Sequence, residues 1–177
     1  SSISGTYSED SVLSVNVVVE DPDGQGSYNL QWQKTDNNGN WSNLTYQTGS
    51  SLSLNQQHVG YEIRVKISHK DDRGNESTAF SHETSTIQNV NDLPTGNLIL
   101  SGDTKIGAVI HVDASQIDDE DGLGNLSFQW QYSTTSANSP NRSWYNINGA
   151  NQSYYNITNS DAFNALRVMA NYTDHYN

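Results

Sequence analysis

Hydrophobic and polar residues alternate over short stretches of this chain, and the stretches are separated by turns rich in Asp, Asn and Gly. The clearest alternation is Tyr-Glu-Ile-Arg-Val-Lys-Ile at 61–67, shorter runs occur at 28–33 and 51–54, and 12–20 is rich in β-branched residues. A period of two indicates strands with one buried face, and no segment keeps the 3.6-residue period of an amphipathic helix. Strands of this length, about 8 to 12 residues apart, predict an antiparallel β-sandwich.

The chain also contains an internal repeat of nearly one hundred residues. Ser4-Gly5 matches Ser101-Gly102 at an offset of 97; Asp21-Pro22-Asp23-Gly24 and Gln31-Trp32-Gln33 match Asp119-Glu120-Asp121-Gly122 and Gln129-Trp130-Gln131 at 98; Trp41, Leu54, Arg64 and Asp71 match Trp144, Ile157, Arg167 and Asp174 at 103. The insertion falls in a polar segment, where surface loops tolerate extra residues. We therefore predict an all-β chain of two tandem immunoglobulin-like Greek-key sandwiches of the seven-strand type, residues 1–90 and 91–177.

The second copy stops at Asn177, the counterpart of Gly74. In the first copy the chain continues from Asn75 through a seventh strand to Ile87, so we expect the second sandwich to lack its last strand and to keep an unpaired edge. Three explanations remain open at this stage. A further domain could be inserted after Asn177, with the last strand returning later; the sequence could be truncated; or a neighbouring chain could donate the strand.

The amino-acid composition excludes several classes of function. The chain has 20 acidic and 8 basic residues, a formal net charge of −12 and no Cys. Eight scattered Lys and Arg residues cannot form the basic stripe that nucleic acids or anionic membranes require. No apolar run approaches the ~20 residues of a membrane span, and any export signal is expected outside these residues. Without disulfides, a metal ion is the commonest staple for a small core.

Topology turns the scattered acidic residues into a candidate site. In a seven-strand sandwich, the loops after the second and sixth strands meet at the end where the first strand enters. In the second copy this groups Asp119, Glu120, Asp121 and Asp174 with the linker residues Asn89, Asn91 and Asp92, and in the first copy it groups Asp21, Asp23, Asp71 and Asp72. Carboxylate and amide oxygens without Cys or paired His suit calcium. The alternative is that Asp-Pro-Asp-Gly is simply a turn with solvated side chains.

Residues 89–94, Asn-Val-Asn-Asp-Leu-Pro, resemble the calcium-binding linker between cadherin repeats. The whole module, with its Asp-x-Asp-Gly, Gln-Trp-Gln, Trp, Ile/Leu-Arg-Val and Asp-x-x-Gly landmarks, resembles the immunoglobulin-like tandem repeats of giant calcium-dependent (RTX) bacterial adhesins secreted by type I systems. Carried over residue by residue, the resemblance implies cation roles for Asp21, Asp23, Asp71, Asn89, Asn91, Asp92, Asp119, Asp121 and Asp174.

The same resemblance implies a role as well as ligands. Repeats of this family act as calcium-stiffened extenders that project ligand-binding domains from the bacterial cell surface, so the implied partners are neighbouring domains of one large adhesin. The chain is also similar to the split domain of ice-binding adhesins of marine bacteria, which implies a lectin-like domain inserted after Asn177. We expect an extracellular, monomeric module.

The sequence contains none of the catalytic motifs for which we searched. The five His residues lack metal-protease spacing, and there is no Gly-x-Ser-x-Gly elbow or phosphate-binding loop. We therefore expect a non-catalytic protein. The rival function is carbohydrate or peptide binding through Trp144, Tyr145 and Tyr154, whose rings are flanked by Asn residues. Trp32 and Trp130 are expected in the two cores, and Arg64 and Arg167 over aromatic rings.

Overall fold

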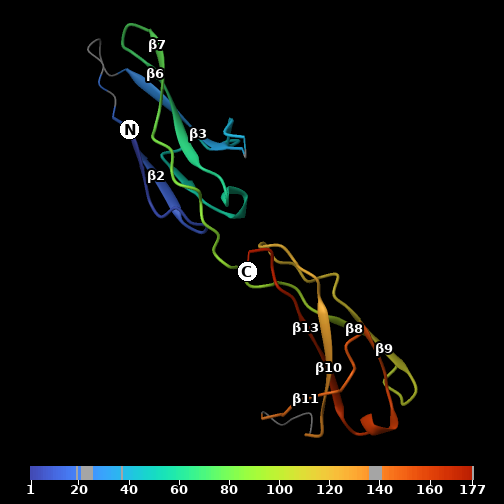
Figure 1. Cartoon of the computed structure of the whole chain (residues 1–177). Helices are drawn as coiled ribbons and strands as arrows, with labels where there is room; N and C mark the ends of the chain where they lie inside the picture. Colours follow the sequence, from blue (N-terminus) through green and yellow to red (C-terminus); the bar gives the residue numbers. More distant parts are fainter. Residues whose placement is uncertain (19, 21–25, 37, 136–140, 177) are drawn as a thin grey trace. The chain divides into compact units, whose positions relative to one another are not determined.

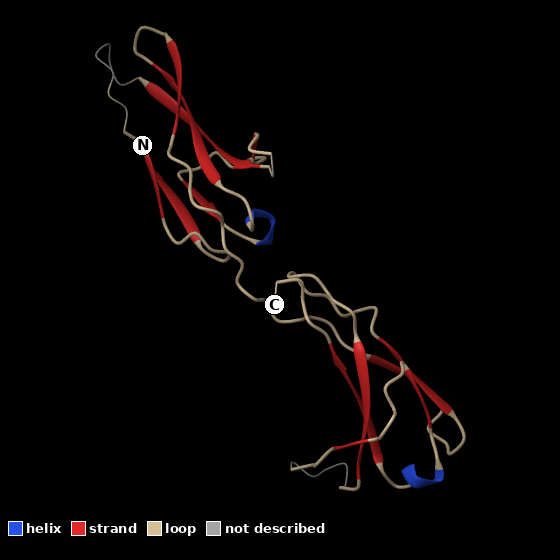
Figure 2. Ribbon diagram, viewed as in Figure 1, coloured by secondary structure: helices blue, strands red, loops and turns tan. Residues whose placement is uncertain are grey.

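The computed structural model describes residues 1–18, 20, 26–36, 38–135 and 141–176. The chain divides into two compact units, Ser1–Val90 (unit 1) and Asn91–Asn177 (unit 2). Antiparallel strands make up both units (Figures 1 and 2), and the only helices among the described residues are two single 3-10 turns, so the all-β prediction is confirmed. No helix in the described ranges is long and apolar enough to cross a membrane.

Unit 1 is built from two antiparallel sheets. Strands β1 (Ser2–Ser4), β2 (Val12–Asn16) and β5 (Ser51–Ser53) pair in the order β1-β2-β5, and strands β3 (Ser27–Thr35), β4 (Trp41–Asn43), β6 (Ile63–Lys70) and β7 (Glu76–Phe80) pair in the order β4-β3-β6-β7. The short 3-10 turn η1 spans Gln56–His58. The core side chains Leu13, Trp32, Leu52, Ile63 and Ile87 are each at most 1% exposed.

Across its described residues, unit 2 repeats this order with one strand fewer. Strands β8 (Ile99–Gly102), β9 (Val109–Asp113) and β12 (Tyr154–Asn156) pair in the order β8-β9-β12, and strands β10 (Ser127–Ser133), β11 (Tyr145–Asn146) and β13 (Ala165–Asn171) pair in the order β11-β10-β13; the turn η2 spans Asn159–Asp161. Among the strands that the structure describes, none pairs with β13 in the way β7 pairs with β6. The buried core is smaller and consists of Ile110, Val112, Trp130 and Ile157.

The two repeated tryptophans lie at the centres of these cores, as predicted. Trp32 and Trp130 are each 0% exposed, and they sit opposite Val65 and Val168 in the strand registers. Each indole N–H donates to a backbone carbonyl, at 2.8 Å for Trp32 and 2.9 Å for Trp130. A buried indole needs such an acceptor, and the repeat supplies one in both units.

The two repeated arginines lie over aromatic rings, again as predicted. The Arg64 guanidinium is 4.2 Å from the ring centre of Trp41 and 4.1 Å from that of Phe80, and Arg167 is 4.4 Å from that of Trp144. Their Nε groups donate to the side chains of Gln33 and Gln131 at 2.8 and 2.7 Å. These glutamines point away from the core, yet both are only 8% exposed because the arginines and their aromatic partners cover them.

One non-glycine residue of unit 2, Phe163, has a left-handed backbone conformation, and the matching residue of unit 1 is a glycine, Gly60. Gly60 has φ +82° and Phe163, at the matching position, has φ +65° with a fully exposed side chain. The left-handed conformation costs an L-residue about 1 kcal/mol, and an exposed ring gains no packing in return.

Phe163→Gly is therefore expected to stabilise unit 2 by about 1 kcal/mol, measured as the midpoint of urea unfolding. Gly60→Phe is the matched control in unit 1. Nothing lies within 4 Å of a Cβ built at Gly60, so the control tests the backbone alone and should destabilise unit 1. A loss of stability in Phe163→Gly would contradict this explanation.

Candidate metal site at one end of unit 2

Three segments that are far apart in the sequence meet at one end of unit 2. The backbone amide of Asp92 donates to Asp121 Oδ2 at 2.7 Å, and the amide of His175 donates to the Asp121 carbonyl at 3.4 Å. The Tyr172 hydroxyl donates to Asp119 Oδ2. The loop after the second strand of this unit therefore lies beside the chain that leaves β13 and beside the first residues of the unit (Figure 1).

A glycine makes this close approach feasible. Gly122 has φ +92°, and a Cβ at this position would overlap the imidazole ring of His175. Its amide donates to the Asp119 carbonyl at 3.0 Å, and the Asp121 amide donates to Asp119 Oδ1 at 2.9 Å. These turn contacts hold the Asp119 and Asp121 side chains against the segment at 172–175.

Asp121 has the most unusual environment of the acidic residues at this end. Its side chain is 2% exposed and that of Asp119 is 7% exposed. Asp121 Oδ2 accepts the Asp92 amide, whereas Oδ1 is buried without a hydrogen-bond partner among the described residues. Leaving a buried polar atom without a partner costs about 1–3 kcal/mol, and more for a charged group. This oxygen therefore requires a cation or a hydrogen-bond donor.

Other acidic side chains at the same end could supply further oxygens. Within unit 2, carboxylate oxygens of Asp92 and Glu120 lie within 4.8 Å of one another. An open cavity of about 440 Å³ beside them is lined by Asn91, Asp92, Asp119, Tyr172 and Asp174, among others. Acidic residues that could hold a metal ion are thus present at this end of unit 2.

The negative charge at this end of unit 2 affects the pKa of Tyr172. The hydrogen bond to Asp119, burial and the negative charges of Asp119, Asp174 and Asp121 raise the pKa of Tyr172 to about 12. The phenol is protonated near neutral pH and donates to Asp119. Negative charge that disfavours a phenolate is the same charge that favours a bound cation.

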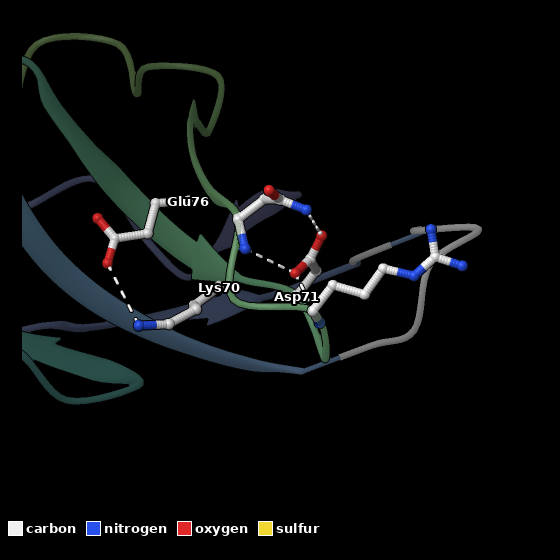
Figure 3. Close-up of polar contacts among 5 residues, drawn as sticks. Lys70, Asp71 and Glu76 are labelled. Carbon is white, nitrogen blue, oxygen red and sulfur yellow. Dashed lines mark hydrogen bonds and ion pairs between the residues drawn. The ribbon is translucent and has the colours of Figure 1, made fainter.

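In unit 1, Asp71 is engaged by its own loop. Its Oδ1 accepts the amides of Arg73 and Asn75 at 2.8 Å each, and its Oδ2 accepts the Asn75 side-chain amide at 2.7 Å (Figure 3). The hydrogen bond from the Asn75 side chain is the main cause that lowers the pKa of Asp71. Asp36 makes the same three bonds to Asn38 and Asn40 in the β3–β4 hairpin. The Asp-x-x-Gly-Asn sequence is therefore a hairpin closure, and it accounts for Asp71 without a cation.

Asp71→Ala is expected to lower the melting temperature of unit 1 by about 5 °C at pH 7, because three donors lose their acceptor. The pKa of Asp71 is lower in the folded state, so its contribution exists above the unfolded pKa of about 3.9 and disappears as the pH falls through the folded value. The difference between variant and parent should therefore vanish at acidic pH. If chelation at pH 7 lowers the melting temperature of unit 1 in the parent by as much, and leaves that of unit 1 in Asp71→Ala unchanged, Asp71 binds a metal ion instead.

The remaining predicted oxygen ligands divide between the two units. Asp21 and Asp23 lie outside the described residues. Asp174 lines the cavity of unit 2, and its Oδ1 accepts the Tyr176 amide at 2.9 Å. Asn91 belongs to unit 2, whereas Asn89 belongs to unit 1, where its Oδ1 is 3.1 Å from the Gln56 side-chain amide.

The sequence did not predict a role for Glu9 or Tyr172. Glu9 is 2% exposed, and its two carboxylate oxygens lie 2.8 and 2.9 Å from the Gln56 amide, whose nitrogen must face them. The repeat gave no signal for either residue, because Glu9 corresponds to Ile106 and Tyr172 to His69. The only available signal for Glu9 was its position beside Asp10, just before the second strand.

The aromatic residues proposed for ligand binding do not form one surface. Tyr145 is on β11 and its ring lies 5.6 Å from that of Tyr132, whereas Tyr154 is on β12, in the other sheet, 6.2 Å from the ring of His111. Trp144 is partly covered by Arg167. The three side chains therefore take part in separate local contacts within unit 2.

No protein-family model matches this sequence, and no curated protein matches it either. The functional argument therefore rests on the chemistry of the acidic end of unit 2. The side chains that meet there offer carboxylate, amide and phenol oxygens, and one buried carboxylate oxygen has no donor among the residues that the structure describes. Such a set can bind a hard cation.

Proposed function

We propose that unit 2 binds calcium at this acidic end. Asp121 supplies the central ligand through Oδ1, and Asp92, Asp119, Glu120 and Asp174 supply further oxygens or neutralising charge. The observation that carries the proposal is the burial of Asp121 Oδ1 without a hydrogen-bond partner among the described residues, since a bound cation stabilises a buried carboxylate oxygen that has no donor. A cation also removes the mutual repulsion of the neighbouring carboxylates.

The donor atoms favour calcium over other metals. Zinc prefers Cys and His ligands, and the acidic group that includes Asp92 and Glu120 contains neither. Magnesium demands a regular octahedron and keeps several of its waters, whereas calcium accepts six to eight oxygens in irregular arrangements. Side chains from a turn, a strand end and the first residues of a unit are more easily arranged around calcium.

We further propose that the chain is a calcium-stabilised extender of a bacterial cell-surface adhesin, with neighbouring domains of that adhesin as its partners. Support comes from two features of the chain. Similar β units are repeated in tandem, and the first residues of unit 2 are held within that unit, where the Asp92 amide donates to Asp121 Oδ2 at 2.7 Å. Calcium at Asp92 and Asp121 would hold these first residues of unit 2 in place. Sites of extracellular modules are typically weak, with Kd about 10⁻⁴–10⁻³ M.

Titration calorimetry on the whole chain tests the binding step. Calcium added to chelator-treated protein should give a saturable heat in that affinity range, and magnesium should bind more weakly. The proposal fails if calcium gives no saturable binding up to about 10 mM, a concentration above the range of extracellular sites. It also fails if magnesium binds equally well, because the irregular oxygen set would then not select calcium.

A further inference from the structure

Unit 2 contains a second cavity, away from the acidic end and beside the first residues of strand β13. Its volume is about 290 Å³, and its lining includes Leu100, Thr104, Ile110, Ile157, Asn164 and Leu166. The lining is largely apolar and comes from both sheets. It includes Leu166 of β13, the strand that no described strand covers on its outer edge.

In unit 1, the corresponding space is occupied by Ile87. This residue is 1% exposed and belongs to the core cluster of Leu13, Leu54 and Ile63, which are the counterparts of Ile110, Ile157 and Leu166. The backbone confirms the match. The Ile87 amide donates to the Tyr61 carbonyl and the Gln88 amide to the Tyr7 carbonyl, both at 2.9 Å, and the counterparts of these acceptors are Asn164 and Thr104 in the cavity lining.

The segment that leads to Ile87 also completes the edge of β6. Ser81 exchanges hydrogen bonds with Val65, whose amide donates to Ser81 Oγ at 2.9 Å, and Thr84 does the same for Ile63, at 3.0 Å. Val65 and Ile63 are both 0% exposed. Their counterparts on β13, Val168 and Leu166, are only partly buried.

The surroundings of the repeated arginine also differ between the two units. Arg64 lies between two rings, Trp41 on one neighbouring strand and Phe80 at the end of β7. Arg167 has Trp144 as the counterpart of Trp41, and the structure describes no ring in the place of Phe80. An aromatic ring supplied by a docked segment would therefore reproduce at Arg167 the arrangement of Arg64.

We propose that unit 2 is a docking site for one extended peptide segment with the chemistry of residues 76–88. The segment pairs antiparallel to β13, places an aromatic ring over Arg167 and hydroxyl side chains at the amides of Val168 and Leu166, and inserts an aliphatic side chain into the 290 Å³ cavity. Main-chain pairing gives affinity, and the cavity and the arginine give specificity. The assignment rests on the repeat and is independent of calcium.

The test uses the whole chain and a synthetic peptide with the sequence of residues 76–88, Glu-Ser-Thr-Ala-Phe-Ser-His-Glu-Thr-Ser-Thr-Ile-Gln. Saturable binding is expected in amide NMR titrations, with slowed hydrogen exchange at Leu166, Val168 and Ala170. The matched control is the same peptide carrying Phe80→Ala and Ile87→Asp, which should bind at least 10-fold more weakly. Neither peptide should change unit 1, where the chain's own segment already occupies the equivalent edge.

Three results would overturn the proposal. Equal binding of the two peptides would show that the cavity and Arg167 do not select the segment. Protection of amides other than those of β13 would place the binding elsewhere. Protection of the β13 amides in the chain alone, together with a dimer in light scattering, would show that a second copy occupies the edge.

Discussion

Calcium is expected to raise the melting temperature of unit 2 by about 10 °C or more. At a concentration 100 times Kd, a ligand that binds only the folded state adds about 2.7 kcal/mol to stability. For a unit of this size, each 1 kcal/mol corresponds to about 4–8 °C. Calorimetric scans of the whole chain in calcium and in chelator measure the shift.

Asp121→Asn should abolish this rise in melting temperature. The parent should be the more stable protein in calcium, and the variant should be at least as stable as the parent in chelator. The Asn carbonyl can still accept the Asp92 amide, while the buried negative charge is gone, so without calcium the variant should be as stable as the parent or more so. With calcium it should be the less stable protein, because it lacks the central ligand.

The matched control is Asp103→Asn, which makes the same change of charge in the same unit. Asp103 is exposed and pairs at 2.9 Å with the exposed Lys105, a contact that contributes little. This variant should keep the full response to calcium. If Asp121→Asn also keeps the full response, Asp121 is not a ligand.

Trp130→Ala is expected to lower the stability of unit 2 by about 3–5 kcal/mol, a large part of the total for a small domain. The ring is fully buried, packs against Tyr155 at 5.7 Å between ring centres, and donates to the Gln152 carbonyl. The two cores contain no shared residue, so the unfolding transition of unit 1 should not move. Chemical denaturation followed by near-UV circular dichroism measures both transitions.

Trp144→Ala is the comparison for that variant. Its ring lies on the outer side of the sheet, 4.4 Å from the Arg167 guanidinium and 5.3 Å from that of Arg142. The variant loses mainly these cation–π contacts, worth about 0.5–1 kcal/mol each where they are partly exposed. The loss should therefore be clearly smaller than for Trp130→Ala. A similar small loss for both variants would mean that Trp130 is not a core residue, contrary to its environment.

The fold could be predicted because the sequence contains it twice. Single alternating runs are ambiguous, but residues that recur in both copies indicated which positions the shared structure uses, as Trp32 and Trp130 do in the cores and Arg64 and Arg167 do over aromatic rings. The meeting of the 119–121 and 172–174 loops followed from strand order alone.

The repeat could not distinguish ligands from turn residues. Asp71 and Asp174 occupy equivalent positions, yet the Asn four residues after Asp71 satisfies its carboxylate, a local contact that strand order does not reveal. Glu9 and Tyr172, whose counterparts in the other copy are residues of a different type, were missed because their partners come from distant segments. The burial of Asp121 Oδ1 depends on side-chain packing and required the structure.

A crystal structure of the chain grown in calcium, with anomalous diffraction data collected at long wavelength, tests the central proposal most directly. We expect an anomalous peak about 2.3–2.6 Å from Asp121 Oδ1, surrounded by oxygens of neighbouring acidic side chains. A peak-free map in which Asp121 Oδ1 accepts a hydrogen bond from water or protein would contradict the proposal.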